Sequence, residues 1–190
     1  MTTELKDPFL RGLTEQVEAV RLDARGLTHG LTTEQMNWQP GPGRWSIAQC
    51  LEHVTLTVGL YRERVPAMVA EARARQQASA KPYRAGAMAR WLIRSLEPPY
   101  RMRVRTMAVV DPPAKQDPAK VIADFDAAHE ELERMIASAD GVPLDQARAT
   151  SPFSKLMKMT LGQMLEVNVV HARRHLWQAR QVRQQPGFPS

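Results

Sequence analysis

The segment that decides the fold is Trp45-Ser46-Ile47-Ala48-Gln49-Cys50-Leu51-Glu52-His53, which marks the beginning of a long helix. Ser46 and Gln49 have the spacing of a capping box, in which the serine side chain accepts from the Gln49 amide and the glutamine side chain reaches back. Apolar residues then recur at helical spacing, at Leu51, Val54, Val58, Tyr61, Val65 and Met68. Strong helix formers continue to about Arg75, so Pro66 is expected to kink this helix without ending it.

Three more stretches carry the same helical pattern together with their own start signals. Asp7, Asp117 and Thr160 each stand where a helix N-cap is expected. The helices that follow them are expected over about 8–25, 118–140 and 161–184, and the first is expected to stop at the interruption formed by Gly26 and Gly30. Four amphipathic helices of this length predict an all-α protein built as a four-helix bundle.

The long connection between the second and third bundle helices, residues 76–116, has a different composition. Five prolines surround a single apolar piece over 88–96, which is predicted to form an extra helix. Two further segments are expected to be loops, the Pro-Gly stretch 40–43 and the stretch around Ser151-Pro152-Phe153.

Length and composition favour one helical domain. The chain has 190 residues, of which 43% are hydrophobic, enough for a core that does not depend on disulfides. Ala, Leu, Met, Glu, Gln and Arg are plentiful, whereas β-branched residues rarely cluster. We expect a single domain over 1–190, with its core at about 8–184 and a C-terminal tail at 185–190.

The cysteine count and the first residues of the chain indicate a cytoplasmic protein. Cys50 is the only cysteine, so no intramolecular disulfide can form and a secreted disulfide framework is excluded. No apolar run near the start resembles a signal peptide, and no stretch of eighteen apolar residues occurs. Cytoplasmic residence without membrane association is therefore expected.

The charge is basic, with 26 Lys and Arg against 20 Asp and Glu, a net charge of +6. The excess is spread over 84–105 and 173–183, without a lysine-rich tail or a recognisable nucleic-acid module. We therefore interpret it mainly as solvated helix faces, with attraction of an anionic partner as the alternative, and do not expect nucleic-acid binding.

The segment His171-Ala172-Arg173-Arg174-His175 carries the chemistry. Residues four apart lie one turn apart on the same face of a helix, so the two imidazoles can share one metal ion. Their face is otherwise mostly apolar and is expected to point into the bundle, while the three neighbouring arginines, Arg173, Arg174 and Arg180, point elsewhere. A pair of this kind is more often part of a core, but His53 on the second bundle helix would complete an open three-imidazole site for a divalent metal.

Other polar residues have less definite assignments. His29 is expected at the surface, and His129 could be a fourth ligand, a hydrogen-bond partner of a ligand or, as the favoured reading, a core residue. Glu52 and Asn168 are candidate acceptors for the ligand histidines. Cys50 is interpreted as a small core residue rather than a soft ligand. No glutamate stands between His171 and His175, so hydrolysis with an adjacent general base, as in metalloproteases, is not supported.

The two motifs together resemble the DinB-like superfamily. In that family a helix opened by tryptophan and serine carries a histidine two turns on, as in Trp45-Ser46 to His53, and the last helix carries a His-x-x-x-His pair followed by glutamine, as in His171 to Gln178. The resemblance extends from about Leu10 to Val182 and assigns the ligand role to His53, His171 and His175. It implies an up-down-down-up bundle, frequent homodimers, and zinc or nickel as the metal.

The resemblance leaves the reaction open. Some members resemble thiol-dependent transferases or isomerases that use a low-molecular-weight thiol such as bacillithiol or mycothiol. One hypothesis is therefore a metal-dependent thiol S-transferase or isomerase, in which Arg173 or Arg174 could recognise the carboxylates of the thiol cofactor, with a plain surface position as the alternative for both. The alternative is a non-catalytic stress-response or binding module with a structural or vestigial metal site. Leu22, Leu27 and Val169 could supply the apolar surface of a homodimer.

Overall fold

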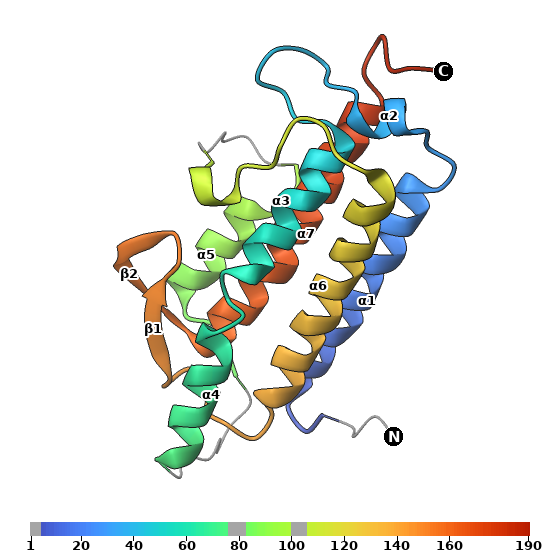
Figure 1. Ribbon diagram of the computed structural model, residues 1–190. Helices are drawn as coiled ribbons and strands as arrows, with labels where there is room; N and C mark the ends of the chain where they lie inside the picture. Colours follow the sequence, from blue (N-terminus) through green and yellow to red (C-terminus); the bar gives the residue numbers. More distant parts are fainter. Residues whose placement is uncertain (1–4, 76–82, 100–105) are drawn as a thin grey trace.

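The computed structural model describes residues 5–75, 83–99 and 106–190, and its main body is a bundle of four long helices (Figure 1). They are α1 (Pro8–Thr28), α3 (Ile47–Gly59), α6 (Pro118–Ser138) and α7 (Leu161–Arg183). The shorter elements are α2 (Thr33–Asn37), α4 (Arg64–Ala74), α5 (Ala87–Leu96), the 3-10 helix η1 (Ala108–Val110) and the strands β1 (Arg148–Ser151) and β2 (Ser154–Thr160). The predicted four-helix bundle is confirmed, and α5 confirms the extra helix in the long connection.

Side-chain contacts between the helices give their relative directions. Arg173 and Arg180 of α7 bind Gln16 and Asp23 of α1 in the same order along both helices, so these two helices run parallel. Arg62, directly after α3, binds Glu131, and Arg73 of α4 donates to the carbonyl of Ser138 at 2.8 Å. Helices α3 and α4 therefore run in the same direction as α6. Figure 1 shows α1 and α7 rising from the end of the bundle where the N-terminus lies, while α3 and α6 descend towards it.

The helix starts follow the caps expected from the sequence. Asp7 and Asp117 accept from the backbone amides two residues on, ahead of a proline at the first helical position. Complete capping boxes begin α2, α3 and α7, at Thr32, Ser46 and Thr160. Local sequence therefore determines where each bundle helix begins.

The prediction that the second helix continues through Pro66 was wrong. The helix ends at Gly59, and residues 60–63 form turns in which Leu60, Tyr61 and Arg62 donate to carbonyls three residues back. Pro66 cannot donate to the carbonyl of Arg62, and it lies instead in the first turn of α4, where a backbone donor has no intrahelical partner anyway. The proline thus divides the expected helix in two.

The first helix is longer than predicted, because Gly26 does not interrupt it. It continues to Thr28, whose hydroxyl donates to the carbonyl of Ala24 at 2.9 Å, and Leu27 is buried in the core. The burial of this last turn offsets the helical cost of one glycine. The helix stops before Gly30, which adopts a φ of 74°.

The expected loop around Ser151-Pro152-Phe153 is the tip of a β-hairpin, which an all-α prediction did not include. Strand β1 pairs antiparallel with β2, with Arg148 opposite Thr160. Successive side chains of a strand point to opposite faces, and in β2 Leu156 is exposed whereas Met159 is buried against the bundle. The hairpin leads directly into the capping box of α7 and so fixes the start of that helix.

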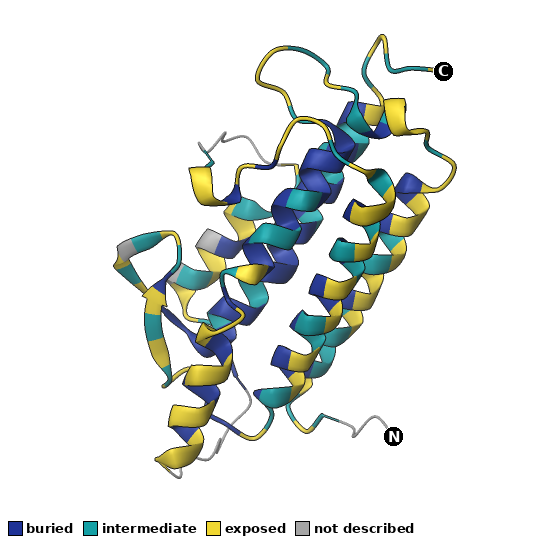
Figure 2. Ribbon diagram, viewed as in Figure 1, coloured by how far each residue is buried: buried dark blue, intermediate teal, exposed yellow. Residues whose placement is uncertain are grey.

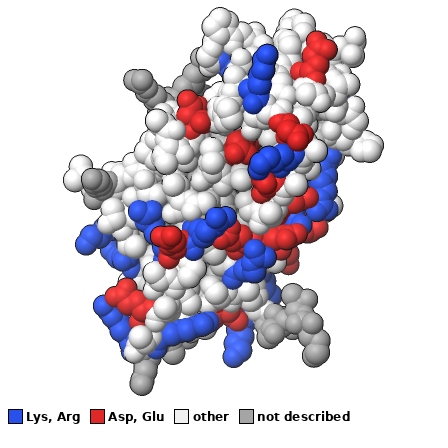
Figure 3. All heavy atoms as spheres, in the orientation of Figure 1, with Lys and Arg blue, Asp and Glu red and all other residues white. Residues whose placement is uncertain are grey.

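The core lies between the four long helices, where Figure 2 shows their inward faces buried and their outer faces exposed. The expected tail also contacts the bundle end, since Phe188 packs edge-on against Trp38 with 5.6 Å between ring centroids. On the face seen in Figure 3, basic and acidic side chains are intermixed over its central and lower parts. Within the described part of the chain, no helix is long and apolar enough to span a membrane.

Candidate metal centre

Three histidines from two helices meet at one point inside the bundle. His53 lies two turns into α3, and His171 and His175 lie on successive turns of α7. The Nε2 atom of His171 is 3.3 Å from Nε2 of His53 and 3.1 Å from Nε2 of His175. One ligand atom from each ring lies within 4.8 Å of the other two. The structure thus brings together the three residues selected from the sequence.

The main chain fixes the orientation of His53. Its Nδ1 lies 2.7 Å from the carbonyl oxygen of Val110, the last residue of η1, so Nδ1 carries the proton and donates. The lone pair of the ring is then on Nε2, the atom that faces the other two histidines. A hydrogen bond of this kind is the usual support for a metal-ligating histidine.

Burial keeps all three imidazoles neutral at neutral pH. Burial, with smaller effects from the nearby His53 and Arg174, lowers the pKa of His171 to about 3. The pKa of His175 is also well below its ordinary value, mainly through burial and then through the same neighbours and His171. Burial lowers the pKa of His53 and outweighs the opposing effect of its hydrogen bond to Val110. Neutral imidazoles are the form that coordinates a metal.

The geometry fits a divalent metal ion. Two nitrogens bound to a tetrahedral metal at about 2.0–2.1 Å lie about 3.3–3.4 Å apart, close to the spacings measured here. The Nδ1 atom of His171 is buried and has no hydrogen-bond partner among residues 5–75, 83–99 and 106–190, so the polar neighbours of that ring are the other two histidines. Three nitrogen donors would leave at least one coordination position open.

An aromatic ring forms one wall of the centre. Trp45, the residue before the serine cap of α3, has its ring centroid 4.7 Å from that of His53 and 5.7 Å from that of His175. The capping box therefore positions both the tryptophan and the histidine. An apolar wall of this kind limits the access of water to the ligands.

The remaining histidines and the cysteine lie outside the centre. His29 is exposed at the C-terminal end of α1. His129 is buried on α6, and its Nδ1 lies 2.7 Å from the carbonyl oxygen of Phe125, so it is a core residue as favoured from the sequence. Cys50 is fully buried in the hydrophobic core, and burial raises the pKa of its thiol. Neither His129 nor Cys50 joins the three-histidine group.

The two acceptors proposed for the ligand histidines were wrong. Glu52 interacts with Lys120 and Asp124 on the side of α6, because a residue adjacent to His53 points to a different face of the helix. Asn168 is buried, but its amide nitrogen donates to the carbonyl of Met164 at 2.7 Å, and its Oδ1 accepts no hydrogen bond from the described residues. For His53 the acceptor is the backbone carbonyl of Val110, which side-chain patterns do not reveal.

Of the three arginines expected to point away from the centre, Arg174 departs from the prediction, whereas Arg173 and Arg180 bind residues of other helices. Arg173 forms an ion pair with Glu97 and a hydrogen bond to Gln16, so it joins α5, α7 and α1. Arg174 was expected to point away from the centre, yet it is only 7% exposed and its charge acts on both His171 and His175. The sequence could have predicted this, because Arg174 stands three residues after His171 and residues at that spacing are neighbours on a helix.

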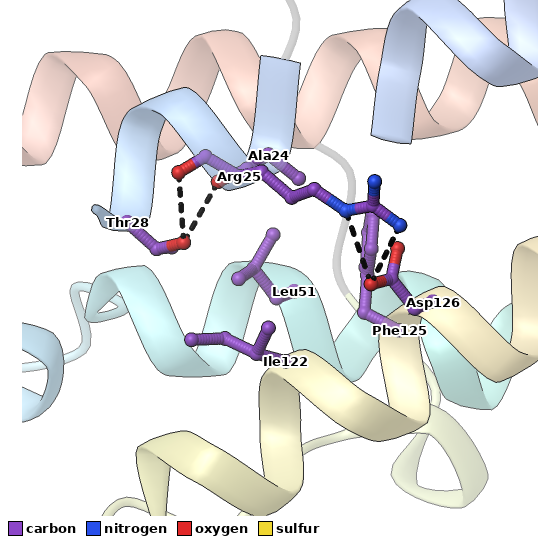
Figure 4. A pocket seen from close by; sticks show the side chains of 7 residues that line it. All are labelled: Ala24, Arg25, Thr28, Leu51, Ile122, Phe125 and Asp126. Carbon is purple, nitrogen blue, oxygen red and sulfur yellow. Dashed lines mark hydrogen bonds and ion pairs between the residues drawn. The ribbon is translucent and has the colours of Figure 1, made fainter. Parts of the chain in front are cut away.

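A small cavity between α1, α3 and α6 is separate from the centre (Figure 4). Its volume is ≈ 10 Å³, room for no more than one water molecule. Leu51 of α3 lines it, and because residues two apart on a helix point to nearly opposite sides, His53 faces away from it. Arg25 and Asp126 close its edge with an ion pair.

Comparison with known proteins places the chain in a family. Among solved structures it is similar to YfiT from Bacillus subtilis, described as a probable metal-dependent hydrolase with an unusual four-helix bundle topology. The two chains are 15% identical, and the match has a TM-score of 0.60 and covers 97% of this chain and 91% of YfiT. At this identity the likeness shows a shared fold. No curated protein sequence matches the chain. The model of the DinB superfamily matches residues 16–179, which include all three histidines, and the protein therefore belongs to the DinB superfamily.

Proposed function

We propose that the protein is a divalent-metal-dependent enzyme that transfers a low-molecular-weight thiol to an electrophile or uses it in an isomerisation. The observation that carries the proposal is the convergence of three neutral Nε2 atoms from His53, His171 and His175. Zinc and nickel are the proposed metals, since imidazole nitrogen suits both.

The ligand set supports a catalytic rather than a structural centre. Structural zinc sites are almost always closed by four protein ligands, whereas catalytic sites have three and an open position. Residues 5–75, 83–99 and 106–190 supply three histidines and no fourth His, Cys, Asp or Glu within the group. His171 is half-buried, whereas His53 and His175 are buried, so His171 is the ligand nearest to solvent.

The residues around the centre favour a thiol over water as the nucleophile. A divalent metal lowers the pKa of a coordinated thiol or water and orients it towards a substrate. Water generally also requires a base to accept its proton, whereas a thiolate is a strong nucleophile by itself. No carboxylate in the described ranges acts on His171 or His175, and Asp111, which acts on His53, is exposed. His53, held by Val110, and the Trp45 ring would orient the reactants and limit water.

Thiol transfer can be tested directly on protein purified without a histidine tag and loaded with zinc or nickel. We expect metal-dependent conjugation of bacillithiol or mycothiol to an activated aryl halide, lost on addition of a chelator and in His175→Ala. His29→Ala, which removes an exposed histidine, is the matched control and should retain the activity. Metal-dependent hydrolysis of an ester without any thiol would instead favour the reaction named for YfiT and contradict thiol transfer.

A chelator experiment separates this proposal from a structural metal site. An open three-ligand site contributes less to folding than a closed site does. Removing the metal should therefore shift the midpoint of thermal unfolding by a few degrees while abolishing activity. Unfolding of the whole protein on chelation would support the non-catalytic alternative.

A further inference from the structure

Two segments outside the four long helices lie on the same side of the bundle. One runs from residue 83 to the end of α5, and the other is the hairpin of β1 and β2, both drawn to the left of α3 and α7 in Figure 1. They meet at the start of α7, where the ring of Tyr83 lies against Gly162, two residues after the end of β2. His171 lies more than two turns further along α7, so this side of the protein is distinct from the metal centre.

These two segments account for the whole net charge of the chain. Residues 83–96 and 148–160 contain six basic residues and no Asp or Glu, whereas the rest of the chain has 20 Lys and Arg against 20 Asp and Glu. Glu97, directly after α5, is already paired with Arg173. The six basic residues are Lys155 and the exposed Arg84, Arg90, Arg94, Arg148 and Lys158. This side of the bundle therefore attracts anions.

The same segments expose large apolar side chains. Trp91 of α5 is 66% exposed, because the helix buries Ile93 and residues two apart on a helix point to nearly opposite sides. In β2, Leu156 is 98% exposed. Each of the two has a basic neighbour on its own face, since Arg94 follows Trp91 by one helical turn and Lys158 follows Leu156 by two positions of the strand. Apolar and basic groups thus occur together in both segments.

We propose that this side of the bundle binds an anionic phospholipid surface, with Trp91 and Leu156 entering the headgroup region and the basic residues meeting the anionic headgroups. Proteins that lie on a membrane combine apolar side chains at the headgroup boundary with Lys and Arg that attract anionic lipids. Tryptophan is enriched at that depth. The expectation of no membrane association considered spanning and signal segments, and a surface of this kind requires neither.

Leu156 favours a lipid surface over a nucleic acid, the other common polyanion. Proteins bind single-stranded nucleic acids through basic grooves and aromatic rings on which the bases stack. Trp91 could serve in that way, but an aliphatic side chain offers neither a ring face nor a hydrogen bond. A leucine almost fully exposed beside a lysine gains most where it can leave water for hydrocarbon.

Sedimentation of the full chain with lipid vesicles tests the proposal. At low salt we expect binding to vesicles that contain phosphatidylserine and phosphatidylcholine, at least tenfold weaker binding to phosphatidylcholine alone, and a loss of affinity as salt is raised. Arg94→Gln combined with Lys158→Gln should lower the affinity for the anionic vesicles at least tenfold. Lys120→Gln, which removes an exposed charge from α6, is the matched control and should change it less than twofold.

The apolar part of the surface is tested at one position. Leu156→Ser leaves the charge unchanged and should weaken binding to the anionic vesicles at least fivefold, whereas Leu156→Trp should bind at least as tightly as the wild type. Because the side chain is exposed, both variants should unfold at the temperature of the wild type.

Three outcomes would overturn the proposal. They are failure of the wild type to bind the anionic vesicles at low salt, a loss in Lys120→Gln equal to that of the double variant, and unchanged vesicle binding in Leu156→Ser. Tighter binding to a single-stranded oligonucleotide than to the vesicles, unaffected by Leu156→Ser, would identify a nucleic acid as the partner instead. None of these measurements involves a metal ion, so their failure would leave the proposed function intact.

Discussion

The imidazole of His53 donates from Nδ1 to the main-chain carbonyl of Val110 at 2.7 Å, which joins the α3 side of the metal centre to the long connection. Nearby, Gln49 donates to the carbonyl of Pro112 at 3.2 Å, so the segment after η1 is held along the start of α3. The ligand geometry of His53 and the position of η1 therefore depend on each other.

Metal binding should slow hydrogen exchange in η1. Coordination at Nε2 strengthens the donor at Nδ1, and the hydrogen bond to Val110 then restrains the short helix. The amides of Val110 and Asp111, which donate to Met107 and Ala108, are expected to exchange more slowly in the metal-loaded protein. The amide of Gln35 in the α2 cap is the internal control, and equal exchange at η1 with and without metal would contradict the coupling.

Acid should destabilise the metal-free protein, and His129 should account for part of the loss. Burial lowers the pKa of His129 to about 4, below the value of about 6.5 for an unfolded chain. The unfolded state then binds more protons below about pH 6.5, so the contribution to stability is complete above that pH and falls as pH drops towards 4. Between pH 7.5 and 5 the loss from this residue is about 2 kcal/mol.

Urea unfolding at pH 7.5 and pH 5 in the presence of a chelator measures this effect. His129→Met removes the titrating ring from the core and should reduce the acid-induced loss by about 2 kcal/mol. His29→Asn, at an exposed position, should leave the loss unchanged. An equal pH dependence in His129→Met and the wild type would contradict the assignment.

Gly162 should tolerate no side chain, whereas Gly26 should. A Cβ atom at Gly162 would lie 2.6 Å from the ring of Tyr83, which packs on the start of α7 and against Phe9. Gly162→Ala is expected to cost about 1–3 kcal/mol of unfolding free energy. Nothing lies within 4 Å of a Cβ at Gly26 in the exposed face of α1, so Gly26→Ala should gain about 0.5–1 kcal/mol. Thermal unfolding compares the two, and equal stability would be inconsistent with the packing of Tyr83.

We propose that the protein forms a homodimer that leaves both metal centres open. Of the residues named from sequence for its interface, Leu27 and Val169 are buried in the core, and Leu22 on α1 remains, with 57% of its surface exposed. Light scattering should report about twice the chain mass of 21.4 kDa, and Leu22→Glu should lower it towards a single chain. A mass near 21 kDa for the wild type at micromolar concentration would contradict the dimer.

Local sequence predicted the helices of the bundle well, because caps and apolar periodicity act within a few residues. The boxes at Ser46 and Thr160 both form as predicted. The sequence did not predict the break before Pro66 or the hairpin formed by β1 and β2, since each depends on which backbone donors find partners in the folded chain. Motif spacing likewise identified the three histidines, but it did not predict which groups contact them. Val110 lies in the connection 76–116, where the sequence around it has no helical or strand periodicity. The buried position of Arg174 depends on how α7 packs in the bundle.

Metal content is the most direct test of the central claim that His53, His171 and His175 form one divalent-metal site. Protein purified without a histidine tag, and titrated with zinc and nickel while its metal content is measured by mass spectrometry, should bind about one ion per chain. His53→Ala, His171→Ala and His175→Ala should each lower the affinity at least 100-fold, while His29→Ala retains it. Failure of the wild type to bind either metal, or equal binding by the three variants and the wild type, would contradict the account.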